Sequence, residues 1–157
     1  MAKKIINNVY ETSNSIENID VVVSTKAKEL YAQLLSCNDN AKVRQIVTNN
    51  LCVELCKCFK IKNVTEVRIC NTQQDSKTVN GVCVRKTMGK YIVNQNMIVV
   101  FNKTAVRKQI VAIKSFSDTF LHEFAHVLDH LYYNFATSPH TTGFYKRISS
   151  LKQKLST

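Results

Sequence analysis

Apolar residues recur three or four positions apart in two segments near the start of the chain, 25–36 and 41–59. This is the period of one face of an α-helix, so both segments are predicted to be amphipathic helices that pack together. Ser24 or Thr25 is suited to cap the first helix, and the polar run 38–40 ends it. The polar residues 1–23 are expected to form an irregular lead-in.

After residue 59 the pattern changes from helical spacing to short apolar runs. Four segments rich in Val and Ile are separated by Asn, Gln, Gly and Asp: 64–70, 82–85, 91–93 and 97–101. Runs of this length and composition are typical of β-strands. We therefore expect a small, mainly antiparallel sheet after the two helices.

The last third of the chain returns to helical spacing. Residues 104–116 are expected to be helical, and Ser117 with Asp118 is suited to cap a further helix over 119–135. After a loop, the apolar positions of 144–155 predict a terminal amphipathic helix.

The length of the chain sets the number of domains. A chain of 157 residues, 45% of them hydrophobic, is long enough to bury a core and too short for two ordinary domains. We predict one α+β domain over 1–157. In it the N-terminal helices pack on the sheet, and the helix over 119–135 and a C-terminal helix follow.

The charge is strongly basic, at +11 for 22 Lys and Arg against 11 Asp and Glu. The cations are spread along the chain, which favours contact with DNA or another polyanion. The alternative is a solvated basic surface without such a partner.

The sequence has no run of about 18 apolar residues, and its start lacks the apolar centre of a signal peptide. An intracellular, cytoplasmic protein without membrane contact is therefore expected. Its six cysteines are interpreted as reduced thiols rather than a disulfide framework. Cys52 and Cys56 are interpreted as packing residues rather than a second metal site.

Residues 122–126 form an HExxH motif inside the helix predicted over 119–135. On a helix, His122 and His126 lie one turn apart on the same face, where both imidazoles can bind one Zn²⁺ ion. Glu123 then lies where its carboxylate can take a proton from a zinc-activated water and pass it to a leaving amine. The motif thus predicts hydrolysis of a peptide bond with Glu123 as general base.

A catalytic zinc site needs a third protein ligand, and two histidines follow the motif. His130 continues the helical series, but it would lie roughly 12 Å along the axis from His122. His140 comes 14 residues after His126, beyond a turn, so the chain can fold back and present it. His140 is favoured, and His130 is the alternative.

Two carboxylates lie at helical spacing from the ligand histidines. Asp118 is four residues before His122, and Asp129 is three residues after His126, so either carboxylate can accept an imidazole N–H and orient that ring. His130 is a third candidate for such a supporting role. The segment 97–101, if it forms the sheet edge beside the HExxH helix, can bind an extended peptide by strand addition.

The segment 118–151 resembles the SprT-like zinc metalloproteases, the group that includes the Spartan proteases. The resemblance rests on the apolar approach to HExxH, on a third histidine after a loop of similar length, and on Phe144 followed by a basic helix. It implies a zincin-like α+β fold with zinc on His122, His126 and His140, and Glu123 as catalytic acid and base. The resemblance also implies one zinc per chain. Several family members bind DNA and cleave proteins attached to it, which implies DNA-associated proteins as substrates.

Three classes of function remain open at this point. The first is an active zinc metallopeptidase that acts on protein or peptide substrates. The second is a basic nucleic-acid-binding protein with a structural or inactive zinc site, in which Glu123→Gln would leave salt-sensitive DNA binding unchanged. The third is a zinc hydrolase that acts on another amide.

Overall fold

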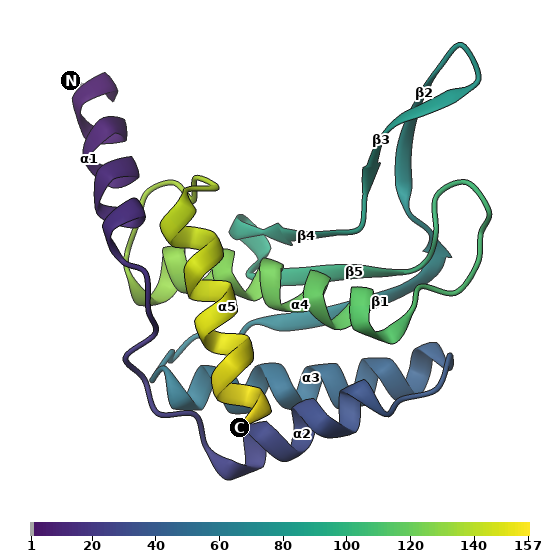
Figure 1. Cartoon of the computed structure of the whole chain (residues 1–157), viewed down its shortest axis with the longest axis horizontal. Helices are drawn as coiled ribbons and strands as arrows, with labels where there is room; N and C mark the ends of the chain where they lie inside the picture. Colours follow the sequence, from purple (N-terminus) through teal and green to yellow (C-terminus); the bar gives the residue numbers. More distant parts are fainter. Residues whose placement is uncertain (1) are drawn as a thin grey trace.

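The computed structural model describes the backbone of residues 2–157 and the side chains of residues 8–157. Along this range three helices come first, five strands follow, and the last part of the chain is again helical (Figure 1). The helices are α1 (Ala2–Ser15), α2 (Thr25–Leu35), α3 (Ala41–Cys58), α4 (Ile113–Val127) and α5 (Thr142–Ser156), with a short 3-10 helix η1 (Val93–Gln95) and a π-helix η2 (Leu128–Tyr132). The strands are β1 (Glu66–Gln73), β2 (Asp75–Val79), β3 (Val82–Thr87), β4 (Gly89–Ile92) and β5 (Met97–Lys103).

The combination of helices with small sheets confirms the α+β prediction, but the sheet differs from the expected one. Three strands form a mixed sheet in the order β1-β5-β4, in which β5 is parallel to β1 and antiparallel to β4. Strands β2 and β3 form a separate antiparallel hairpin. The parallel pair arises because the hairpin, β4 and the turn through η1 return the chain to the direction of β1 before β5 begins. Two of the three strand pairs are antiparallel, as expected, but they are divided between two sheets, and the parallel pairing of β1 with β5 was not predicted.

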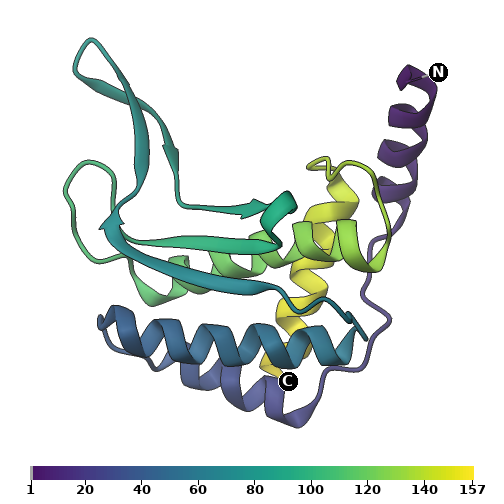
Figure 2. The same ribbon diagram turned by 180° about the vertical axis from the view of Figure 1, so that it is seen from behind.

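Helices cover the sheet and enclose the core (Figures 1 and 2). Helix α3 lies along β1, α2 packs beside α3, and α4 crosses β4 and β5. All residues from Met97 to Asn102 on β5 are buried, because this strand is central and has neighbours on both sides. The phenylalanines of α4 point into this core, namely Phe116, Phe120 and Phe124.

The N-terminal region contains a helix where an irregular lead-in was expected. Helix α1 covers residues 2–15 and projects from the rest of the fold (Figure 1), and only residues 16–24 are irregular. Its C-terminal end is held by α5, since Arg147 donates to the carbonyl oxygens of Ser13 and Ile16. This anchor joins residues far apart in sequence, which a local pattern cannot show.

The start and end of α4 also correct the predicted boundaries. Residues 104–112 form a loop rather than a helix, and α4 begins at Ile113, so Ser117 and Asp118 lie inside it and not at its cap. The loop is held by the buried Arg44 side chain, which donates to the Val111 carbonyl and the Asn102 amide oxygen at 2.8 Å each. The helical pattern ends in η2 at Tyr132, before the expected residue 135.

All six cysteines are free thiols. Cys52 and Cys56 are fully buried in the main core, which agrees with a packing role. Among the helices of the described chain, none has the length and apolarity that a membrane crossing requires.

Candidate metal centre

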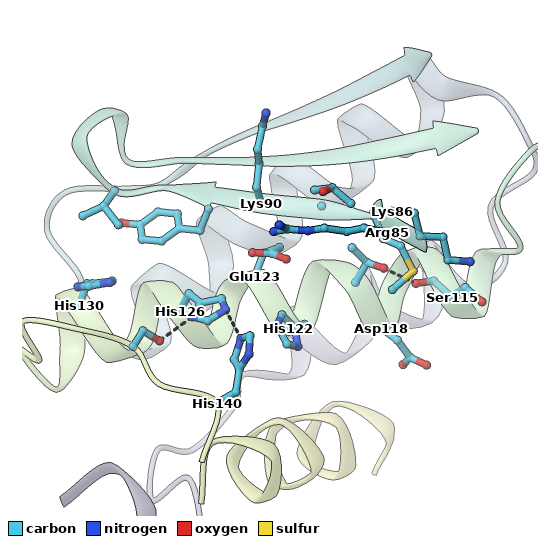
Figure 3. Close-up of a pocket in the computed structure, with 17 residues that line it drawn as sticks. Arg85, Lys86, Lys90, Ser115, Asp118, His122, Glu123, His126, His130 and His140 are labelled. Carbon is cyan, nitrogen blue, oxygen red and sulfur yellow. Dashed lines mark hydrogen bonds between the residues drawn. The ribbon is translucent and has the colours of Figure 1, made fainter. Parts of the chain in front are cut away.

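Three histidines converge beside the sheet (Figure 3). Helix α4 places His122 and His126 one turn apart, and the loop before α5 brings His140 to them. One ligand atom from each of the three imidazoles lies within 4.8 Å of the others, and the Nε2 atoms of His126 and His140 are 3.0 Å apart. Two imidazole nitrogens on one tetrahedral zinc lie roughly 3.3 Å apart, since each Zn–N bond is about 2.0–2.1 Å. The spacing of this cluster therefore fits one ion.

The π-helix and the cap of α5 set the position of His140. In η2 the Tyr133 amide donates to the Leu128 carbonyl at 2.9 Å, which widens the last turn before the chain leaves the helix. The chain then reverses, and the Thr141 hydroxyl caps α5 by accepting from the Phe144 amide at 3.0 Å. His140 is the residue just before this cap, so its backbone is held from both sides.

Phe144 forms the floor of the cluster. Its ring centroid lies 5.2 Å from that of His122, 4.8 Å from that of His126 and 5.1 Å from that of His140. The Phe144 side chain is fully buried. The ring thus excludes water from one side of the imidazoles and limits their rotation.

The surroundings of the histidines favour their neutral form, which is the form that binds metal. Burial, together with the neighbouring histidines, lowers the pKa of His126 to about 3. Burial and the nearby His140 also lower the pKa of His122. Near neutral pH both nitrogens are therefore available as ligands without the loss of a proton.

Glu123 lines the same cavity as the three histidines. It is 8% exposed, and burial raises the pKa of its carboxyl group to about 7, although a hydrogen bond from the Tyr91 backbone amide on β4 opposes this shift. A carboxyl group with a pKa near the working pH can both accept and return a proton. The geometry and the pKa thus suit a general base.

A chain of polar contacts leads from His126 to a buried ion pair. The Ser138 hydroxyl lies 2.6 Å from His126 Nδ1 and donates to Asp129 Oδ2 at 2.7 Å. Because the hydroxyl hydrogen goes to Asp129, its oxygen accepts from Nδ1–H, which leaves His126 Nε2 free for metal. Asp129 in turn bonds Arg147 at 2.9 Å, and both side chains are buried. Asp129 therefore supports His126 through Ser138, not by the direct contact predicted.

We expect Ser138→Ala to weaken zinc binding about 10–100-fold, because the hydroxyl that orients His126 is lost. Competition with a chromophoric chelator measures this affinity. Ser149→Ala is the control, since Ser149 is an exposed serine on α5 whose hydroxyl bonds only its own helix. Equal zinc affinity in the two variants would show that the hydroxyl does not orient the ligand.

The other two candidates for a supporting role have different partners. Asp118 forms an ion pair with Lys152 of α5, and among the described side chains no hydrogen bond joins it to an imidazole. His130 lies outside the three-histidine cluster, and its Nδ1 is 3.0 Å from the Phe135 carbonyl oxygen. The prediction of an orienting role for Asp118 is thus wrong, and His140 rather than His130 completes the cluster.

Sequence reasoning missed Ser138 and Arg147. Arg147 offered a signal, because it lies on the apolar face of α5 with Phe144 and Leu151, where an arginine needs a buried partner. Ser138 offered none beyond its place beside a proline. Its role depends on the contact of the loop with Asp129.

The cluster opens into a cleft of about 830 Å³ between α4 and β4. β4 is the edge strand here, while β5 is central, so the condition for peptide binding along 97–101 is not met. The Tyr91 amide faces Glu123 and not β5. Since alternate residues of a strand point their backbone groups to the same side, Gly89 also presents its N–H and C=O toward the cleft.

Gly89 allows β4 to lie close to α4. A Cβ atom at this position would lie 2.7 Å from Thr119 Cγ2, 3.0 Å from the Val99 carbonyl oxygen and 3.3 Å from Glu123 Cγ. The absence of a side chain at Gly89 thus sets the width of the cleft beside Glu123.

We expect Gly89→Ala to lower the free energy of unfolding by about 1–3 kcal/mol through overpacking, as measured by urea denaturation. Thr119→Ser removes the nearest methyl group and keeps the hydroxyl that bonds the Ser115 carbonyl. The alanine should therefore cost less in the Thr119→Ser background. The same cost in both backgrounds would contradict a clash with the methyl group.

Comparisons with known proteins identify no relative of this chain. No family model matches the sequence, and neither the curated proteins nor the solved structures contain a significant match. The function of the cleft must therefore be inferred from its own residues.

Proposed function

We propose that this protein is a zinc-dependent metallopeptidase with a zincin-like fold, in which Glu123 acts as general base. The observation that carries the proposal is that three imidazoles and a buried glutamate with a raised pKa line one open cleft. Imidazole ligands suit zinc, whereas magnesium and calcium prefer oxygen ligands. The donor set therefore fits the ion that the HExxH motif predicts.

The number of ligands supports a catalytic rather than a structural metal site. Structural zinc sites are usually closed by four protein ligands, whereas catalytic sites have three and keep one position open. The cluster contains three ligand residues within the part of the chain that the structure describes, and it faces the cleft. Zinc held by His122, His126 and His140 would supply a Lewis acid that lowers the pKa of a water.

Glu123 then moves the protons of the reaction. Its carboxylate accepts a proton from the attacking water and, once protonated, donates it to the nitrogen of the leaving amine. Burial keeps the pKa near 7, so both directions of transfer are accessible at neutral pH. The Tyr91 amide holds the carboxylate toward β4 and thereby orients it.

The edge strand supports a peptide as substrate. Gly89 presents its N–H and C=O to the cleft, and Tyr91 presents its C=O, since its N–H donates to Glu123. An extended peptide can add to such an edge by main-chain hydrogen bonds. A strand bound along β4 lies above α4, where the cleft holds Glu123 and the histidines. The scissile carbonyl is thereby brought to the metal centre.

Zinc analysis of the purified protein tests this proposal. We expect one zinc per wild-type chain, weaker binding in His140→Ala, and unchanged binding in the control His130→Ala. Cleavage of a protein substrate, assayed with and without DNA, should stop on chelation and return with added zinc. A wild-type chain that neither contains nor takes up zinc would overturn the proposal.

A further inference from the structure

The β2–β3 hairpin leads directly into the edge strand of the cleft. It extends away from the three-stranded sheet (Figure 1), and β3 ends two residues before β4 begins. Arg85 and Lys86 at the end of β3 line the cleft together with Glu123 and the histidines. Figure 3 shows the Arg85 side chain extending along the cleft in the direction of Glu123, with Lys86 turned toward Ser115.

These two cations give one end of the cleft a net positive charge. Among the described side chains, neither Arg85 nor Lys86 forms a salt bridge, whereas the third cation of the lining, Lys90, pairs with Asp75. Of the two acidic residues in the lining, Asp118 pairs with Lys152. Arg85 is exposed to the cleft and has no carboxylate partner, so it is available to a ligand.

The opposite end of the cleft has a different character. It is lined by Tyr91 of β4, by Val93 of η1 and by His130 of η2, whose ring centroid is 6.1 Å from that of Tyr91. The cleft is thus aromatic and apolar at one end and basic at the other. The orientation of a bound peptide therefore determines which of its two ends lies at the basic end of the cleft.

The direction of β4 assigns the basic end to one side of the scissile bond. The strand runs from Gly89, which lies against Thr119 and Glu123, toward Tyr91, which lies near His130. Antiparallel pairing is the commoner and slightly more stable arrangement of two strands, and a peptide that pairs with β4 in this way begins near Tyr91 and ends near Gly89 and Arg85. The residues after its scissile bond therefore approach Arg85.

We propose that the cleft selects peptides with an acidic side chain on the C-terminal side of the scissile bond, and that Arg85 binds that carboxylate. This inference rests on the proposed function, since it assigns the substrate class of the same site. A guanidinium group binds a carboxylate through two parallel hydrogen bonds, which gives direction as well as charge attraction. A peptide is favoured over nucleic acid because the cations lie beside an edge strand inside a cleft of about 830 Å³, which suits a few extended residues.

Cleavage of matched peptides tests the preference. Peptides with Glu, Gln or Lys at each of three positions on either side of the scissile bond are compared by kcat/KM in wild type, Arg85→Glu and Arg107→Glu. Arg107 is the control, because it is an exposed arginine in the loop before α4, outside the lining of the cleft. We expect about tenfold preference for Glu over Gln at one C-terminal position, reversal toward Lys in Arg85→Glu, and the wild-type preference in Arg107→Glu.

Binding to the zinc-loaded Glu123→Gln protein gives a readout that needs no catalysis. Fluorescent Glu-rich, Gln-rich and Lys-rich decapeptides and a single-stranded oligonucleotide serve as probes, with and without Arg85→Glu. Arg85-dependent binding of the Glu-rich peptide, combined with a zinc-loaded wild-type protein that cleaves none of the peptides, would support the recognition and refute the peptidase. Cleavage without an acidic preference, a preference on the N-terminal side, or Arg85-dependent binding of the oligonucleotide alone would overturn the inference and leave the peptidase standing.

Discussion

Glu123→Gln is expected to lower kcat/KM for peptide hydrolysis by about 10²–10⁴-fold, the usual contribution of a general acid or base. Glutamine has nearly the same shape, so the packing against β4 should persist, but an amide cannot accept a proton from water. Zinc content should stay at the wild-type value, because Glu123 does not belong to the histidine cluster. Parallel measurement of zinc and kcat/KM separates the loss of the base from the loss of the metal.

Glu29→Gln makes the same chemical change at an exposed position of α2 and should keep the wild-type rate. The predicted pattern is therefore a large rate loss in one variant and none in the other, with equal zinc in both. Full activity of the Glu123→Gln protein would mean that another group accepts the proton. An activity loss that parallels a loss of zinc would mean that Glu123 acts on the structure of the site.

Arg147→Met is expected to lower the free energy of unfolding by about 3–5 kcal/mol, because it leaves the buried Asp129 carboxylate without its partner. The side chains of Arg147 and Asp129 are 1% and 0% exposed. The guanidinium also donates to two carbonyl oxygens at the end of α1 and to the Ser13 hydroxyl. Its loss therefore affects the N-terminal helix and the support of His126 together. Urea denaturation of the metal-free protein measures the change.

Lys146→Met provides the matched control on the same helix. Lys146 is the preceding residue and pairs with Glu17, but both partners are half exposed, so the expected loss is at most about 1 kcal/mol. The zinc affinity of Lys146→Met should equal that of wild type, and that of Arg147→Met should be lower. Similar stabilities of the two variants would show that the buried pair contributes no more than a surface pair.

The N-terminal helix is connected to the metal centre through the same arginine. Gly143, in the first turn of α5, leaves no space for a side chain, since a Cβ atom there would lie 2.4 Å from the Ser13 carbonyl oxygen. The end of α1 thus lies directly against the start of the helix that follows His140. These contacts connect the end of α1, which is far away in the sequence, to the support of the site.

The β2–β3 hairpin shows how far the strands could be predicted from the sequence. Segment 82–85 was correctly predicted as a strand, but β2 was not, because all five of its residues are exposed and lack apolar alternation. Asn80-Gly81 was the available signal, since both residues have positive φ and form the two-residue turn between the strands. A hairpin without a buried face is recognised by its turn rather than by its hydrophobic period.

The sequence by itself determined the parts of the site that depend on local geometry. His122, Glu123 and His126 lie on one helix, and the helical repeat alone places the two imidazoles on one face and the carboxylate beside them. The helix after His140 was likewise predictable from its apolar period and is observed as α5. Such features follow from spacings of a few residues, so they hold in any fold that forms the helix.

Only the tertiary structure decided which distant groups meet. His140 rather than His130 joins the cluster because the chain reverses after η2, and Ser138 and Asp129 support His126 because Arg147 holds the carboxylate from another helix. β4 borders the cleft because β5 pairs on both sides and is buried in the middle of the sheet. These contacts depend on packing between elements far apart in the chain, and periodicity along one segment carries no information about them.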